Sequence, residues 1–194
     1  MATNITLNKS ITSASAVSGL WSLTLSDVNG ILIGSKAEVG GFMTPAYNVA
    51  SVTVLSVNTT TKVVTYQHAN TTVSAFSPDA NFHLQVSWID NAYVIDMLGF
   101  TPTGDDLDYL TADVDAANDF AFRKRKEAGY DPHPAYPAGS DVRLGTGLYA
   151  MLLYRERGTS GDQYAGYTNM GQFDRPVSLG RVMQLLGTGR AQLA

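Results

Sequence analysis

The chain has 194 residues, a formal net charge of −4, 44% hydrophobic residues and no cysteine. This length can hold one medium domain or two small ones, and the lack of cysteine excludes disulfides, thiolate metal sites and thiol nucleophiles. The first residues lack the basic start and apolar run of a signal peptide, and no apolar stretch reaches the ~20 residues that cross a bilayer. We therefore expect a soluble protein that starts life in a cytoplasm and does not enter a membrane.

Residues 1–90 are predicted to form β-structure. Serine, threonine and valine dominate, and the segment 20–25 alternates between large apolar and small polar side chains, as a half-buried strand does. The clearest predicted hairpin pairs 49–57 with 62–67, and a last strand covers 82–89. Its large side chains on one side are Phe82, Leu84, Val86 and Trp88. Six or seven short strands at this spacing predict a small β-barrel or sandwich.

The apolar period changes at Asp90 from two to about 3.6 residues, which indicates helices. Asp90 or Asn91 can cap a short helix over 92–98, and Gly99 can end it. Ionic residues are also concentrated after this point. Two domains are therefore predicted, 1–90 and 91–194, giving an α+β fold with an N-terminal β domain and a C-terminal bundle of about four helices.

The most regular helical pattern covers 107–128. Its first residues are acidic and its last are basic, an order that complements the helix dipole. A third helix is predicted over 140–157, with Leu144, Leu148, Met151 and Leu152 on one face. We expect Leu110, Val114 and Ala117 to pack against Leu144, Leu148 and Leu152.

Two glycines, Gly145 and Gly147, lie inside the third helix and indicate that another element packs closely against it. A short final helix is predicted over 177–186. The segment 158–177 and the tail 187–194 are polar or glycine-rich, so we expect both to be flexible in the free chain and ordered on assembly.

Patterns that would indicate an enzyme are weak. The three histidines, His68, His83 and His133, are isolated and form no metal-binding pair. The segment 145–150 fits a loose GxGxxA pattern, but no strand precedes it, as a dinucleotide site requires. The acidic cluster of Asp105, Asp106 and Asp108 lacks calcium-loop spacing. We therefore predict no catalytic residue, no cofactor and no metal site.

The basic run Arg123, Lys124, Arg125 and Lys126 has three interpretations. It can be a solvated helix end in which Asp119 pairs with Arg123, a protein–protein contact, or a nucleic-acid contact. The third is disfavoured because the domain is acidic overall and no aromatic residues alternate with the basic ones. Four consecutive helical residues also point in four directions, so they cannot all line one groove.

Several segments after Asp90 together carry a resemblance to a known family. They are LG (98–99), DDLDYL (105–110), AAN (116–118), RKRKEAG (123–129), DVRLG (141–145), LYRERG (153–158), RVMQLLG (181–187) and GRAQ (189–192). In combination they resemble the head-to-tail adaptor, or connector, proteins of long-tailed double-stranded DNA phages, and the last three resemble adaptors of actinobacterial siphophages most closely. About half the chain is covered, and the β domain is an addition to the simplest family members.

The resemblance implies a structural virion protein without catalysis, located in the neck and assembled in the host cytoplasm. It implies a ring of twelve copies between the portal and the tail-proximal stopper protein, with DNA passing through the channel unread and the β domain as a candidate capsid contact. The alternatives are another phage component, such as a tail or decoration protein, or a DNA-binding regulator. The candidate subunit or portal contacts are Asp105, Asp106, Asp108, Arg123, Lys124, Arg125, Lys126, Arg155, Arg157, Arg181 and Arg190.

Overall fold

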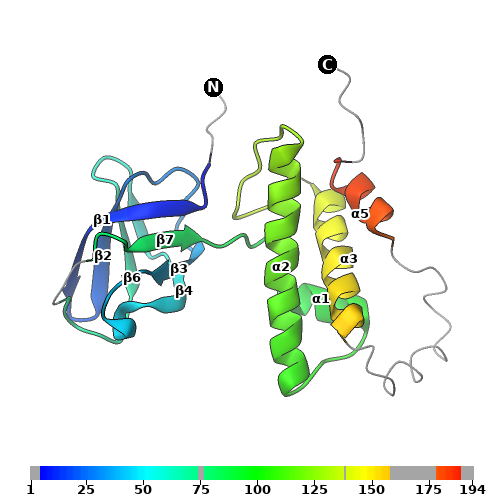
Figure 1. The fold of residues 1–194 in the computed structure, drawn as a ribbon, viewed down its shortest axis with the longest axis horizontal. Helices are drawn as coiled ribbons and strands as arrows, with labels where there is room; N and C mark the ends of the chain where they lie inside the picture. The colour runs from blue at the N-terminus through cyan, green and yellow to red at the C-terminus, as the bar shows by residue number, and fades with distance from the viewer. Residues whose placement is uncertain (1–4, 74–76, 138, 158–177, 189–194) are drawn as a thin grey trace. The chain divides into compact units, whose positions relative to one another are not determined.

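A computed structural model describes residues 5–73, 77–137, 139–157 and 178–188. The chain forms two compact units, one built around a β-sheet and one around helices (Figure 1). The first unit runs to Ser87 and also takes His133–Tyr136, while the second starts at Trp88 and resumes at Pro137. The predicted α+β class is confirmed.

The first unit holds one curled seven-stranded sheet with the order β4-β3-β7-β1-β2-β6-β5, in which all neighbours are antiparallel. The two edge strands, β4 and β5, follow each other in the chain and are separated only by residues 54–55. Because one short run of chain serves both edges, the sheet must curl toward a barrel. The strands are β1 (Asn8–Val17), β2 (Leu20–Leu25), β3 (Lys36–Gly40), β4 (Val49–Thr53), β5 (Ser56–Asn58), β6 (Val63–Gln67) and β7 (Asn81–Leu84).

Strand β2 follows the alternation of its sequence. Trp21, Leu23 and Leu25 are buried, while the residues between them are partly exposed. The tight β1–β2 turn places Ser18 and Gly19 at positive φ, the backbone that suits the twist of a two-residue hairpin. The buried side of β2 thus supplies the centre of the β-unit core.

The predicted hairpin of 49–57 with 62–67 is only partly correct. Residues 56–58 do pair with β6, but 49–53 pair with β3 at the other edge of the sheet. At the crossover, Val54 donates its N–H to Ser35 O and Leu55 donates to Thr65 O, both at 2.8–2.9 Å. The sequence pattern does not reveal this change of pairing partner, because valines and small polar residues continue through the bend between β4 and β5.

The described residues of the second unit form four helices, with the glycine ends that the sequence predicts. Asp90 caps the first helix by accepting the Tyr93 N–H at 2.9 Å, and Gly99 closes it with φ of 76°. The predicted helix 107–128 is observed at nearly the same bounds. The helices are α1 (Asn91–Leu98), α2 (Asp105–Glu127), α3 (Ser140–Arg157) and α5 (Leu179–Leu185).

The predicted apolar face of α3 is only partly correct: Met151 is buried as expected, but the three leucines do not form the contact with α2. Leu144 is 38% exposed and Leu148 and Leu152 are only partly buried, whereas Ala150 and Met151 pack with Leu110, Val114 and Ala117 in the helical core. The small residues explain the difference, since they let neighbouring helices approach α3 closely.

The close approach predicted at the two α3 glycines is confirmed. A Cβ added to Gly145 would lie 2.9 Å from Leu185 Cβ, and one added to Gly147 would lie 2.7 Å from the Tyr93 ring. The GxGxxA-like segment is therefore a packing surface for α5 and α1. Residues 158–177 and 189–194, which contain the predicted flexible loop and most of the predicted tail, lie outside the described residues.

The start of the second unit is held to α2 by a buried amide. Asn118 accepts the Ile89 N–H at 3.1 Å and donates to Ile89 O at 3.0 Å, and the Trp88 ring lies 6.0 Å from the Phe122 ring. Trp88, which continues the alternation of the predicted strand 82–89, thus belongs to the helical unit, and the strand itself ends at Leu84.

Independent folding of the two units remains a prediction. A truncated chain starting at Trp88 should keep helical circular dichroism and a cooperative thermal transition, because it retains Trp88, Ile89 and the whole helical core. A chain starting at Ala92 is the matched control. It lacks the residues that bind Asn118 and Phe122, so it should melt at a lower temperature. Loss of cooperativity in both would contradict the two-unit interpretation.

Candidate subunit and partner interface

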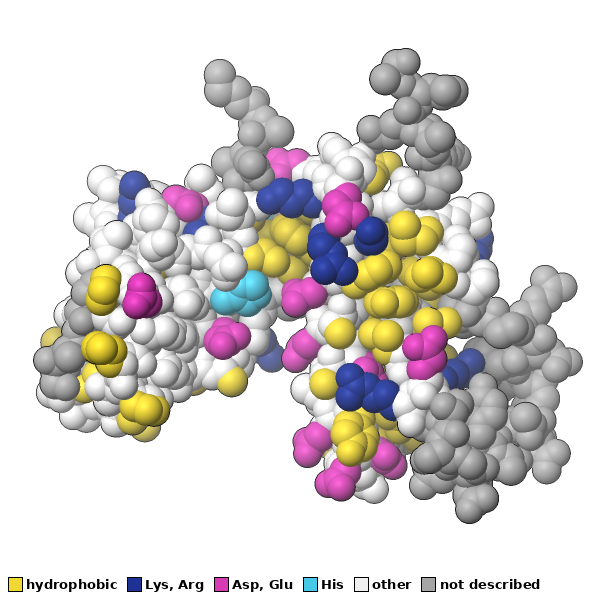
Figure 2. Space-filling view, viewed as in Figure 1, with side chains coloured by type: hydrophobic (Ala, Val, Ile, Leu, Met, Phe, Trp, Pro, Cys, Tyr) yellow, Lys and Arg dark blue, Asp and Glu magenta, His cyan; other side chains and the backbone are white. Residues whose placement is uncertain are grey.

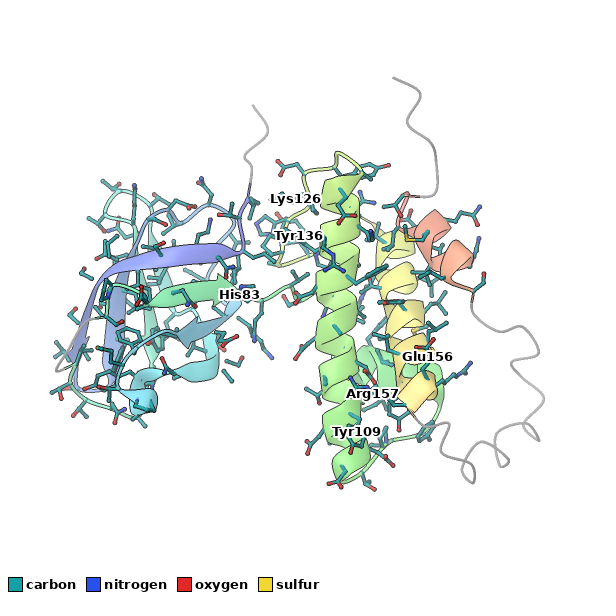
Figure 3. All side chains as sticks on the ribbon, in the orientation of Figure 1. His83, Tyr109, Lys126, Tyr136, Glu156 and Arg157 are labelled. Carbon is teal, nitrogen blue, oxygen red and sulfur yellow. The ribbon has the colours of Figure 1, made fainter. Side chains whose placement is uncertain are left out.

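Seven of the candidate contact residues lie toward the two ends of α2. Asp105, Asp106 and Asp108 are in its first turn, and Lys124, Arg125 and Lys126 are in its last. A helix of 23 residues is about 35 Å long, so the acidic and basic groups do not meet within one subunit. Figure 3 shows Lys126 and Tyr109 at opposite ends of the helix.

Arg125 is an internal residue of the helical unit. It is 8% exposed, its Nη1 donates to Leu186 O at 2.7 Å, and its guanidinium lies 4.0 Å from the centre of the Tyr130 ring. The Tyr130 hydroxyl also lies 3.3 Å from Gly187 O. These contacts satisfy carbonyls at the end of α5, which a helix leaves without partners. Arg125 therefore joins α2 to α5.

The other basic residues of the run are more accessible. Arg123 Nε lies 3.9 Å from Glu127 Oε1 with its side chain 66% exposed, and Lys124 donates to Glu127 Oε2 at 2.7 Å. The hydrogen bond from Lys124 lowers the pKa of Glu127, and Arg123 adds a smaller effect. Lys126 is exposed. Exposed pairs of this kind contribute little to stability, so these charges are available to a partner at low cost.

Arg157, at the end of α3, contacts residues in the N-terminal half of α2, although the sequence pattern groups it with the basic residues of the candidate interface. Its Nε lies 2.8 Å from Asp113 Oδ1, and its guanidinium lies 5.9 Å from the Tyr109 ring centre. The Asp113 side chain is 1% exposed, while that of Arg157 is 50% exposed. Burial raises the pKa of Asp113, and the nearby Arg157 charge only partly offsets this.

Asp113 should make stability depend on pH. Because its folded pKa lies above the ordinary value, the folded chain holds this proton more tightly than the unfolded chain does. The contribution of Asp113 to the free energy of unfolding therefore falls as pH rises. The fall begins near the ordinary aspartate pKa and is complete above the raised pKa of Asp113 in the folded chain. Asp113→Asn should flatten this part of the stability profile, measured by denaturant unfolding at several pH values. Asp115→Asn, at an exposed position, is the control, and equal effects of both would contradict the assignment.

The remaining candidates are dispersed. Arg155 is partly buried near the end of α3, and Arg181 is exposed on α5 with its Nη1 2.9 Å from Gln184 Oε1. Arg190 lies outside the described residues. In the β unit, the buried Lys9 pairs with Asp27, so this charge stabilises the unit internally.

Sequence reasoning missed an exposed row on α2. Tyr109, Ala112, Ala116, Phe120 and Arg123 recur at helical spacing and are all exposed or partly exposed. The Phe120 ring stacks on Tyr149 of α3 at 4.2 Å. Figure 2 shows hydrophobic side chains gathered over α2 and α3, bordered by Lys and Arg, with Asp and Glu at the lower end of α2. The spacing was readable in the sequence, opposite the buried row.

Neither a metal cluster nor a membrane span is found in the described part of the chain. Among those residues, no group of three or more histidine or acidic side chains could hold a metal ion. None of the described helices is both long and apolar enough to cross a bilayer.

Comparison with family models, with curated proteins and with solved structures found no match for this chain. Any inference about the function of this chain therefore depends on its own geometry. That geometry is a curled β unit followed by a helical unit whose longest helix carries opposite charges at its two ends.

Proposed function

We propose that the chain is a structural virion protein, a head-to-tail adaptor of a long-tailed phage. In this proposal it forms a ring of twelve copies between the portal and the tail-proximal stopper protein and extends the DNA channel. The observation that carries the proposal is that one helix, α2, has acidic side chains in its first turn and accessible basic side chains, Lys124 and Lys126, in its last. A ring closed by rotation needs two different, complementary faces on each copy, and this helix supplies them.

The resemblance segments lie where the helical unit is defined. The RKRKEAG and RVMQLLG segments meet through Arg125 and Leu186, DVRLG ends at the tightly packed Gly145, and DDLDYL forms the first turn of α2. Their residues thus have a shared structural role, which supports treating the combination as one helical adaptor unit. The exposed charged side chains of this unit, Asp105, Asp108, Arg123 and Lys126 among them, are then the candidates for contact with partners.

Electron microscopy of the purified chain mixed with the portal protein tests the proposal. The expected result is a ring of copies stacked on one end of the portal. Binding only along tails or on capsid faces would replace the proposal with the tail or decoration alternative. Duplex DNA affinity that falls steeply with salt, without portal binding, would favour the DNA-binding regulator instead.

A further inference from the structure

The exposed row of α2 has a centre. Ala116 is the middle residue of the helix Asp105–Glu127, and it is exposed. The apolar or aromatic residues Tyr109, Ala112 and Phe120 flank it, so the middle of the row is uncharged and both ends are charged. We name the row, with the charged residues beside its two ends, the α2 face. Small residues at its centre let a second helix approach closely.

The charges near the two ends of the α2 face are opposite in net sign: Asp106 and Asp108, with Asp105, lie at the first end, and Lys124 and Lys126, with one acidic residue, Glu127, lie at the second. Asp106 and Lys126 lie equally far from Ala116 along the chain, and so do Asp108 and Lys124. Asp106 and Lys124 are 18 residues apart, about five turns, so they share one flank of the helix. Asp108 and Lys126 share the other flank for the same reason. The first flank is therefore acidic at one end and basic at the other, whereas the second is acidic from Asp108 through Asp115 and Asp119 and becomes basic only at Lys126.

We propose that two copies of this chain dimerise through the α2 face, with the two α2 helices antiparallel and a two-fold axis beside Ala116. This rotation sets Asp106 against Lys124 of the second copy on one flank, and Asp108 against Lys126 on the other. A two-fold contact uses the same patch twice, so the patch must complement itself. Here the acidic end of each copy meets an end of the other copy whose net charge is positive. A parallel arrangement would instead place like charges together.

The centre of the face fits the same rotation. Tyr109 and Arg123 are equidistant from Ala116, so Arg123 of one copy comes to the Tyr109 ring of the other, a cation–π geometry. Ala112 and Phe120 are equidistant as well, so the aromatic ring meets the small side chain. Lys124 leaves its exposed pair with Glu127 at little cost.

The dimer is expected to be weak and sensitive to salt. One helix pair buries a small area, at the lower end of specific interfaces, and its charge pairs are on the rim. Such a contact would keep free subunits from binding other partners, and it is weak enough to dissociate when a stronger partner binds. It also covers both charged ends of α2, so the free dimer is a reserve form of the subunit.

A single introduced cysteine tests the arrangement directly, since the native chain has none. Ala116→Cys should form a disulfide-linked dimer under mild oxidation, because the two-fold axis brings the two positions together. Ala112→Cys is the matched control: its two copies lie about 12 Å apart along the helices, beyond the ~7 Å that a disulfide spans between Cα atoms. Linkage at neither position, at both equally, or at 112 alone would overturn the proposal.

Charge reversal provides an independent test by sedimentation of the full chain. Asp106→Lys with Asp108→Lys, and separately Lys124→Glu with Lys126→Glu, should each weaken self-association at least about tenfold by setting like charges together. An equal mixture of the two variants should restore dimers, now of one copy each. Unchanged association of either variant, or failure of the mixture when circular dichroism shows both folded, would overturn the proposal.

The dimer goes beyond the adaptor function and does not depend on it. It is a property of the free chain in solution, whereas the adaptor is tested on the portal. A monomeric free chain that still forms rings on the portal would remove the dimer and leave the adaptor. Dimers of a chain that ignores the portal would do the reverse.

Discussion

Leu110→Ala is expected to lower the free energy of unfolding by about 2–5 kcal/mol, the usual cost of truncating a fully buried leucine. Leu110 has no exposed surface and lies in the helical core with Val114, Ala150 and Met151. The loss combines the transfer energy of the removed atoms with the cavity left behind. Denaturant unfolding followed by circular dichroism measures it.

Leu144→Ala is the matched control for this experiment. Because Leu144 is 38% exposed in the folded state, its truncation removes less apolar surface from the core and should cost about 1 kcal/mol or less. A small loss at Leu144 would show that this side of α3 does not form the core with α2. A larger loss from Leu144 than from Leu110 would return the core to the leucine face that the sequence pattern favoured.

That pattern failed for a physical reason. Apolar residues occur on several sides of α3, so the periodicity of the sequence permits more than one buried face. The face with the leucines was chosen because leucine is a large apolar residue. The fold uses the small residues Gly145, Gly147 and Ala150 instead, since side chains of α5 and α1 pack directly against the α3 backbone at the two glycines. Which face of α3 is buried depends on where the neighbouring helices pack, and the sequence of α3 alone does not contain that information.

The long helix was predictable because its signals agree. The apolar spacing, the acidic start, the basic end and Gly129 all indicate the same element, which is observed at Asp105–Glu127. The β unit was predictable as a class but not in its pairing, because residues 49–58 read as one strand and pair with two different neighbours. Curvature is a property of the whole sheet.

The role of Arg125 was also readable in the sequence. It follows Ala121 by four residues and precedes Ala128 by three, so it falls on the buried row of α2, apart from its basic neighbours. Asp113 likewise precedes the buried Ala117 by four. Counting charges in a run conceals such positions, whereas assigning each charge to a face reveals them.

Arg125→Glu is expected to destabilise the chain by about 3–5 kcal/mol, the range for a buried charge that loses its partner. The new carboxylate would face the Leu186 carbonyl oxygen that Arg125 now binds, and it would lose the Tyr130 ring. Arg123→Glu is the matched control two residues away. Its side chain is 66% exposed, so unfolding should change by about 1 kcal/mol or less. Equal losses would contradict the internal role of Arg125.

The difference between these two arginines decides how assembly is tested. A variant carrying Arg125→Glu that fails to join heads to tails says nothing about an interface, because the subunit itself is weakened. Arg123→Glu with Lys126→Glu reverses two exposed charges and keeps Arg125 on Leu186. The proposed adaptor should then fold normally yet fail to form rings on the portal, as seen by electron microscopy, while Arg123→Lys with Lys126→Arg keeps both charges and should form them. Normal joining by the reversed variant would show that the basic end of α2 is only solvated.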